Sequence, residues 1–274
     1  MNEKLKAAYE GFGGENIFDV PLQKLNHTVL DYLNMKKNTL VKPEFRLLGC
    51  MDDGVPGKSI GLGGPGIVLA YLAGKRQGKT GWQAVLDGFD TAALVLGGEI
   101  DAVSSHEGCG ACGIIYGFLS GEEQQQFAHS DDLGITFAKE LAGKLGAAYK
   151  HIPMDGMTRP QKVHTARLVF YAGPEQFNID YCMPNGLAFI VSRGILEKLA
   201  DKTFAAETGM FLLETACKIA TGESGLGGLA TAASPFVIVP VGGNKIPLPV
   251  LQKESREVAG KFPGNVAVLE GFTF

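Results

Sequence analysis

The chain has 274 residues, of which 45% are hydrophobic and 20% charged, with a formal net charge of −4 and a pI near 5.8. These values are typical of a globular protein with a substantial buried core. The acidic balance and the lack of a Lys/Arg cluster exclude the concentrated positive charge that nucleic-acid binding requires, so we expect no nucleic-acid partner.

The hydropathy pattern and the cysteine count bear on the cellular setting. No apolar run reaches the roughly 18–20 residues that a membrane span needs, and the N-terminal MNEKLKAAYEGFGGEN has no apolar signal core. The five cysteines are an odd number, and three of them cluster around one histidine. This pattern favours reduced thiols reserved for a metal over a disulfide framework, so we expect a cytoplasmic protein without membrane association.

Helices and strands are predicted to alternate along the first half. The segment from Pro21 to Lys37 spaces its leucines and valine as an amphipathic helix. The elements predicted after it are a strand at 45–49, helices at 65–76 and 82–95, a strand at 99–106, and a helix that begins near Cys112.

The second half continues the alternation and ends in a glycine- and proline-rich tail. Its predicted elements are a helix at 131–148, strands at 149–153, 163–172 and 187–192, a helix at 195–220, and a strand at 235–241. The order predicts an α/β fold with a mainly parallel central sheet flanked by helices. We expect one domain over residues 1–221, with residues 1–40 as a helical arm. Residues 222–274 would form an extension on the same domain, with one strand at a sheet edge or interface.

Three side chains suited to zinc follow two of the predicted strands. Cys50 closes one strand, His106 closes another, and Cys109 follows two residues later. In parallel α/β folds the carboxyl ends of strands gather functional residues. Two cysteines and one histidine would leave the fourth tetrahedral position of zinc open, as catalysis requires. The pattern alone also fits two buried core cysteines and a histidine that caps a turn.

Two linked segments carry a family resemblance over about residues 40–118. PEFRLLGCMDDGVPG resembles the β-carbonic anhydrase strand that ends in C-x-D-x-R, and the stretch that ends in SSHEGCGACG resembles the family's H-x-x-C-G landmark. The resemblance implies a β-carbonic-anhydrase-like fold with a C-terminal elaboration. It also implies zinc held by Cys50, His106 and Cys109, with Asp52 as the catalytic acid beside the zinc-bound solvent.

The same resemblance implies an activity and an assembly. The expected enzyme is a zinc lyase that hydrates carbon dioxide to bicarbonate by a zinc-bound hydroxide. The family's dimers are built through N-terminal helices and sheet edges, so we expect a homodimer or a higher homo-oligomer. The alternatives are a hydrolase of carbonyl sulfide or carbon disulfide, and a catalytically silent zinc protein with a structural or regulatory role.

One departure from the family bears on all of these expectations. Gly54 stands where the family has the arginine that pairs with the aspartate and keeps it off the metal. Without that partner, Asp52 could become a fourth ligand and close the zinc site. Alternatively, a basic residue elsewhere could hold it; the candidates are Lys58, Arg76 and Arg167.

Three further residues near these motifs have alternative interpretations. Cys112 forms a C-x-x-C with Cys109, and we expect it to be packed inside a helix rather than to complete a Cys3His site or a redox pair. For His164 we expect a hydrogen-bonded strand residue, with a proton shuttle or a substrate contact as the alternative. For Glu107 we expect an exposed loop acid, with support of the neighbouring ligand as the alternative.

Overall fold

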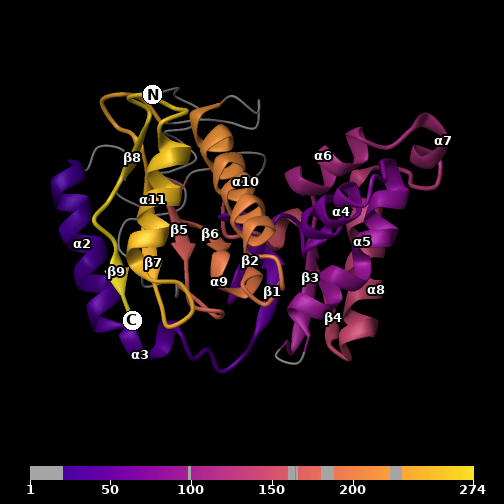
Figure 1. Ribbon diagram of the computed structural model, residues 1–274, viewed down its shortest axis with the longest axis horizontal. Coiled ribbons are helices and arrows are strands. Elements are labelled where there is room, and N and C mark those ends of the chain that lie inside the picture. The colour runs from indigo at the N-terminus through magenta and orange to yellow at the C-terminus, as the bar shows by residue number, and fades with distance from the viewer. Residues whose placement is uncertain (1–20, 98–99, 160–163, 165, 180–187, 223–229) are drawn as a thin grey trace.

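The computed structural model describes residues 21–97, 100–159, 164, 166–179, 188–222 and 230–274. Within these ranges the chain forms two mainly parallel sheets flanked by helices, which confirms the predicted α/β class (Figure 1). None of the described helices has both the length and the apolar character needed to span a membrane.

The first sheet holds the strands that precede the proposed metal ligands. Its strands run parallel in the order β2-β1-β3-β4. They are β1 (Leu47–Cys50), β2 (Ile60–Leu62), β3 (Ala102–His106) and β4 (Ala148–Ile152). The helices of this half are α4 (Ile67–Arg76), α5 (Gly81–Leu96), α6 (Gly110–Gly117), α7 (Gly121–Gln124) and α8 (Ser130–Leu145), and the 3-10 turn η2 (Met154–Gly156) follows β4.

The second sheet repeats the strand order of the first. Its main path is β6-β5-β7-β8, again parallel, and β9 also pairs with β7. The strands are β5 (Leu168–Ala172), β6 (Ala188–Ser192), β7 (Phe236–Gly242), β8 (Val266–Val268) and β9 (Phe272–Thr273). The helices of this half are α9 (Arg193–Leu196), α10 (Lys202–Thr221) and α11 (Leu248–Ala259), and α2 (Leu22–Met35) and α3 (Lys37–Leu40) precede β1.

Alternate residues of β5 face two different cores. Phe170 lies in a cluster with Leu25 and Val29 of α2, whereas Tyr171 lies in the cluster that includes Leu212 of α10. Successive side chains of a strand point to opposite faces of a sheet. Helix α2 therefore covers one face of the second sheet while α10 and α11 cover the other, which explains why β5 is fully buried (Figure 1).

The two sheets meet where β2 lies against β6, near the middle of Figure 1. The Gly61 backbone N–H donates to the Ser192 hydroxyl at 2.9 Å, and the Ile190 N–H donates to the Met51 carbonyl at 3.2 Å. A Cβ at Gly61 would collide with the Ile190 carbonyl oxygen. This close approach of two backbones requires glycine at position 61.

The structure corrects several sequence-based expectations for the second half. The strand predicted at 235–241 is β7, which lies between β5 and β8 and is not an edge strand. Of the strand expected at 163–172, Leu168–Ala172 form β5, while positions 163 and 165 lie outside the described residues. The tail contains α11, β8 and β9 in addition to one strand. The helical spacing of the apolar residues Leu248, Leu251 and Val258, of which Leu251 and Val258 are buried in α11, was the missed signal.

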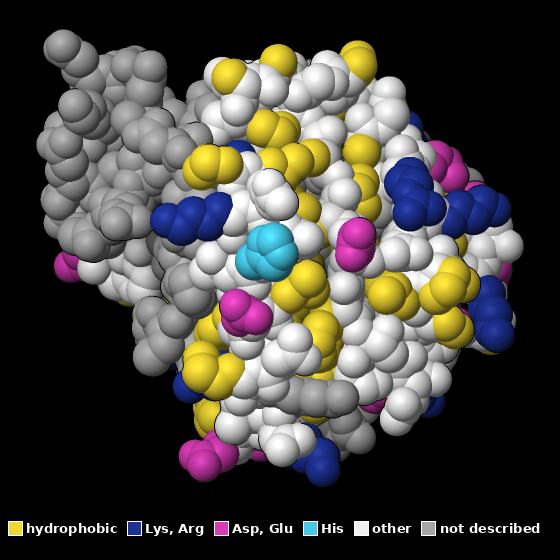
Figure 2. All heavy atoms as spheres, turned by 90° about the vertical axis from the view of Figure 1, so that its left-hand side faces the viewer, with side chains coloured by type: hydrophobic (Ala, Val, Ile, Leu, Met, Phe, Trp, Pro, Cys, Tyr) yellow, Lys and Arg dark blue, Asp and Glu magenta, His cyan; other side chains and the backbone are white. Residues whose placement is uncertain are grey.

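The surface on the α2 side carries charges of both signs (Figure 2). Several basic side chains lie toward the right-hand edge of this view, with acidic ones nearby, and apolar side chains form an interrupted band across the face.

Candidate metal centre

Cys50, His106 and Cys109 converge at one edge of the first sheet. Cys50 is the last residue of β1, His106 is the last residue of β3, and Cys109 directly precedes α6. Neighbouring parallel strands end on the same side, which brings the three side chains together. Their ligand atoms all lie within 4.8 Å of one another and all three residues are buried, so the predicted set can bind a metal ion.

The hydrogen bonds of His106 leave one ring nitrogen for a metal. The His106 Nδ1 lies 3.0 Å from the Glu107 carbonyl oxygen, which only an N–H can satisfy, so Nδ1 carries the proton. Burial would lower the pKa of His106, but the Cys50 sulfur and the Asp52 carboxylate raise it to about 9. The buried Nε2 has no partner within hydrogen-bond distance among the described residues, and it would give up its proton to bind a metal. A metal-ligating histidine commonly has this arrangement, because the donated N–H fixes both the tautomer and the orientation of the ring.

The two thiols are arranged for a cation rather than for a disulfide. The Cys109 Sγ lies 3.8 Å from the Cys50 Sγ, and both cysteines are free. The hydrogen bond from Cys109, together with burial, raises the pKa of Cys50 well above its ordinary value. The hydrogen bond with Cys112 chiefly raises the pKa of Cys109. The raised pKa values keep both groups as neutral thiols in the absence of a cation. As metal ligands they would be thiolates, which need a positive ion between them, and sulfur–nitrogen donor sets suit zinc.

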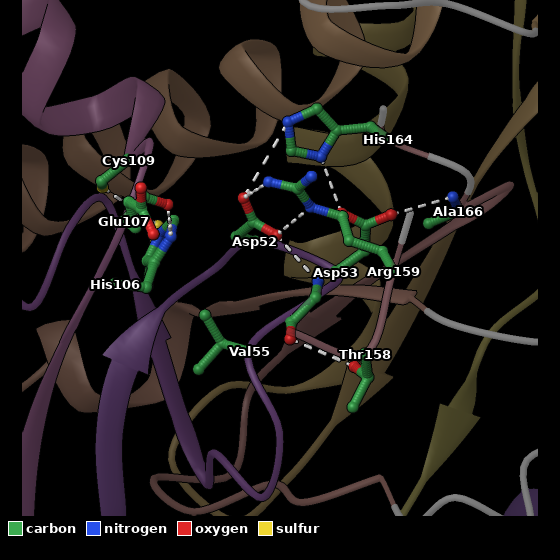
Figure 3. Close-up of polar contacts among 12 residues, drawn as sticks. Asp52, Asp53, Val55, His106, Glu107, Cys109, Thr158, Arg159, His164 and Ala166 are labelled. Atoms are coloured by element: carbon green, nitrogen blue, oxygen red, sulfur yellow. Dashed lines mark hydrogen bonds and ion pairs between the residues drawn. The ribbon is translucent and has the colours of Figure 1, made fainter. Parts of the chain in front are cut away.

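Asp52 is held by Arg159, which follows η2 more than one hundred residues along the chain (Figure 3). Arg159 Nε donates to Asp52 Oδ1 at 2.8 Å, and its second terminal nitrogen donates to Oδ2 at 3.0 Å. The two side chains are only 3% and 5% exposed. A two-pronged guanidinium–carboxylate pair fixes both the position and the orientation of the carboxylate. Both oxygens of Asp52 are therefore hydrogen-bonded to Arg159 and held in place.

The charge state of Asp52 follows from these neighbours. Burial alone would raise its pKa, but the charge of His164 and the Arg159 guanidinium hold that pKa well below its ordinary value. Asp52 is therefore ionised at neutral pH and can accept a hydrogen bond from a reacting group. The Gly54 backbone N–H, which donates to Oδ1 at 2.7 Å, favours the same state.

In the part of the chain that the structure describes, none of the three basic residues predicted to replace the family arginine hydrogen-bonds the Asp52 carboxylate. Lys58 Nζ donates to the Asp52 backbone carbonyl at 2.5 Å, Arg76 pairs with Asp201, and Arg167 donates to the Pro235 carbonyl. The arginine is Arg159, which the sequence analysis did not consider. No sequence signal marked it, since position 159 is fixed against Asp52 only by the path of the chain after β4.

Gly54 and Arg159 depend on each other sterically. A Cβ at Gly54 would lie 2.5 Å from Arg159 Cγ and 2.9 Å from Met157 Cε. The Thr158 N–H also donates to the Gly54 carbonyl at 2.8 Å, which ties the two segments together. The glycine at the family's arginine position therefore makes room for an arginine that arrives from another segment.

A second carboxylate, Asp53, positions His164. The His164 Nδ1 lies 2.7 Å from Asp53 Oδ1, and the Ala166 N–H donates to Asp53 Oδ2 at 3.0 Å. Burial by itself would lower the pKa of His164, but the charge and hydrogen bond of Asp53 raise it. His164 lies before β5 and not on a strand, although it is hydrogen-bonded as expected.

Asp52, Asp53 and His164 also lie close enough together to form a potential metal group. However, Arg159 Nε lies 2.8 Å from Asp52 Oδ1 and 3.4 Å from Asp53 Oδ1. The guanidinium already supplies the positive charge there, so the cysteine–histidine group is the better candidate for a metal ion.

Cys112 packs within α6, as predicted. It is 1% exposed, and its Sγ lies 2.7 Å from the position a Cβ would take at Gly134. The described group with all ligand atoms within 4.8 Å contains Cys50, His106 and Cys109 but not Cys112. Cys217 is a core residue of α10 as expected, and Cys182, predicted to be a core residue, lies outside the described residues.

Glu107 supports the site through its backbone and its side chain. Its carbonyl oxygen accepts the hydrogen bond from His106, and its carboxylate accepts the Met154 N–H at 2.8 Å. Glu107 is therefore an exposed loop acid, as expected, and its backbone carbonyl also helps to orient the His106 ring.

A cavity of about 500 Å³ reaches the cluster at Cys50. Cys50, Asp52 and His164 lie on its wall together with residues of α6 and of α10. The site is thus completed by the second half of the chain, a feature that sequence reasoning did not predict.

No family model, curated protein or solved structure matches this chain. The function must therefore be inferred from the site itself.

The repeated strand order does not repeat the metal ligands. In the pairing register, Cys50 lies opposite Leu62 on β2, and Ala172 lies opposite Ser192 on β6. Ala172 thus takes the position of Cys50 in the second sheet, and Gly173 and Pro174 follow it. These residues offer no metal-ligating side chain, so the first sheet carries the site.

Proposed function

We propose that this protein is a zinc enzyme that hydrates carbon dioxide to bicarbonate. The observation that carries the proposal is the two-pronged pair between Arg159 and Asp52. Because this pair holds Asp52 in place, Asp52 would not bind the metal, and Cys50, His106 and Cys109 would be the three protein ligands. Catalytic zinc sites characteristically have three protein ligands and one open position. The resemblance to β-carbonic anhydrases in the segments around Cys50 and His106 supports the same reaction.

Cys50, His106 and Cys109 would hold the zinc, with the Glu107 carbonyl fixing the His106 ring. When bound, the zinc would supply a Lewis acid that lowers the pKa of water towards about 7. Asp52, kept ionised by Arg159, accepts a hydrogen bond from the attacking water and so orients its lone pair towards the substrate carbon. The reaction consumes carbon dioxide and water and yields bicarbonate and one proton, which passes to solvent.

The experiment is a stopped-flow assay of carbon dioxide hydration on protein whose zinc content has been measured. We expect activity near neutral pH from the wild type and none from zinc-depleted protein, with recovery when zinc is returned. If zinc-loaded wild type is inactive at every pH tested, the protein is instead a silent zinc protein with a structural or regulatory role.

The apolar side of the cavity favours a second candidate reaction. Phe189 and Phe211 lie on its wall, which also includes Cys50. Carbonyl sulfide and carbon disulfide are less polar relatives of carbon dioxide, and their hydrolysis would use the same residues. Assaying all three substrates on one zinc-loaded sample decides between them. The cytoplasmic setting and the homodimer or higher homo-oligomer stay predictions.

A further inference from the structure

The cavity above the cluster is much larger than a triatomic substrate needs. Its volume is about 500 Å³. Liquid water takes up about 30 Å³ per molecule. A molecule of carbon dioxide, with three heavy atoms, would leave most of this space to solvent. A volume of this size instead falls within the range of about 300–1,000 Å³ that is usual for sites that bind small organic molecules.

The walls of the cavity come from both halves of the chain and are mostly apolar. Its apolar lining includes Ile114 of α6, Phe118, Phe189 of β6, and Phe211 and Ile219 of α10. Three of these side chains are partly open to solvent: Ile114 is 37%, Phe118 52% and Phe211 38% exposed. Aromatic side chains exposed around an apolar cavity are typical of a ligand site.

The charged groups on the wall already have partners. Asp52 is paired with Arg159, and His164 is paired with Asp53. Lys218 Nζ lies 2.6 Å from Glu214 on the same helix. A ligand charge buried among these residues would have to compete with an existing ion pair, which is costly. The lining therefore favours an uncharged ligand.

We propose that this cavity binds an uncharged organic compound with an apolar body. The body lies between α6 and α10, and a polar head such as a primary amide, which can both donate and accept a hydrogen bond, faces Cys50, Asp52 and His164. The binding itself depends on the cavity alone. Its consequence, that the site accepts carbonyl compounds larger than carbon dioxide as substrates or inhibitors, rests on the proposed function.

The probes are uncharged amides that share one head and differ in the apolar body: acetamide, butyramide, hexanamide and benzamide. Binding to zinc-loaded protein is measured by nuclear magnetic resonance titration. Burial of each methylene should tighten binding about threefold to fourfold. We expect benzamide to bind at least about tenfold more tightly than acetamide. Benzoate and the benzylammonium ion, which have the same ring and opposite charges, should bind more weakly than benzamide.

Two glycines on α6 provide a matched pair of variants. Gly113 lies on the cavity wall and Gly117 does not. A Cβ added at either position would meet no atom within 4 Å, so both positions accept a side chain. We expect Gly113→Leu to fill part of the cavity and weaken benzamide binding at least about tenfold, with little effect on acetamide. Gly117→Leu should bind all four amides like the wild type.

The outcomes separate this inference from the proposed function, because zinc content and carbon dioxide hydration are measured on the same samples. Three results would overturn the proposal that the cavity binds an uncharged organic compound: equal affinity for all four amides, a preference for benzoate or benzylammonium, or unchanged binding in Gly113→Leu. None of them would contradict the hydration of carbon dioxide. Graded amide binding by a protein that holds zinc but does not hydrate carbon dioxide would support the cavity and overturn the proposed reaction.

Discussion

Arg159 and Asp52 lie 107 residues apart in the chain and form a buried pair that two hydrogen bonds hold, of 2.8 and 3.0 Å. The guanidinium occupies both oxygens of a carboxylate that lies two residues beyond a proposed metal ligand. The position of the Arg159 side chain depends on Gly54, because a side chain at position 54 would collide with Arg159 Cγ. The arginine that holds Asp52 thus comes from a distant segment, whereas the resemblance to the β-carbonic anhydrase motif placed it at position 54.

Replacing Arg159 should release Asp52. Because Arg159 and Asp52 are almost fully buried, Arg159→Met leaves an uncompensated carboxylate and should lower the free energy of unfolding by about 3–5 kcal/mol. The freed carboxylate is drawn to the zinc, so we expect zinc to be retained and hydration at neutral pH to fall sharply. Zinc analysis, chemical denaturation and stopped-flow hydration measure the three quantities. Unchanged activity would show that Asp52 does not need the arginine.

Moving the arginine tests the steric relationship. Gly54→Arg alone should be destabilised by about 1–3 kcal/mol, because the new side chain meets Arg159 and Met157. Gly54 is not among the glycines with a positive φ, so the backbone accepts a side chain there. The double variant Gly54→Arg with Arg159→Gly should be more active than either single variant. If the double variant were no more active than Arg159→Gly alone, an arginine at position 54 would not replace Arg159.

Zinc content tests the ligand set. Cys50→Ser and His106→Ala should lose most of the roughly one zinc per chain and become less stable, because metal binding is coupled to folding. Cys217→Ala serves as the control, since this cysteine is also fully buried but lies on α10, outside the cluster. It should keep its zinc. Full zinc retention in the Cys50 and His106 variants, measured by mass spectrometry of metals, would contradict the assignment.

Cys112 should be separable from the ligands. Because its sulfur packs against α8 near Gly134, Cys112→Ala should keep its zinc and lower the free energy of unfolding by about 1 kcal/mol. Denaturation curves and zinc analysis of the same sample measure both. Loss of zinc would instead indicate a closed site with three cysteines and would count against catalysis.

The His164–Asp53 pair should stabilise the protein in a pH-dependent way. The folded protein raises the pKa of His164 above its ordinary value of 6.5, so the charged pair contributes fully below that pH and loses its effect as pH rises through the higher folded value. His164→Gln should therefore lower the free energy of unfolding by about 1.5–3 kcal/mol at pH of about 5.5, and by less at pH of about 9. Denaturation at the two pH values, with zinc content monitored, measures the difference. His129→Gln, at an exposed histidine, should show little effect at either pH, and a His164→Gln effect that grew with pH would contradict the pairing.

The sequence by itself determined the α/β class and the three proposed metal ligands. Helical periodicity such as that of α2 is a local property, and parallel strands that end in Cys50 and His106 must deliver both side chains to the same edge of their sheet. These conclusions need only the residues within each helix or strand, together with the rule that neighbouring parallel strands end at the same edge of their sheet.

Only the tertiary structure decided which arginine holds Asp52, how Asp53 orients His164, and that α10 closes the cavity. Arg159 has no local sequence feature that distinguishes it from Arg76 or Arg167, since all three have the same charge and reach. What selects Arg159 is the path of the chain after β4, which returns past Gly54 and is fixed by packing between segments distant in sequence. Such contacts depend on the free energy of the whole fold and not on any single segment, so a local pattern cannot rank them.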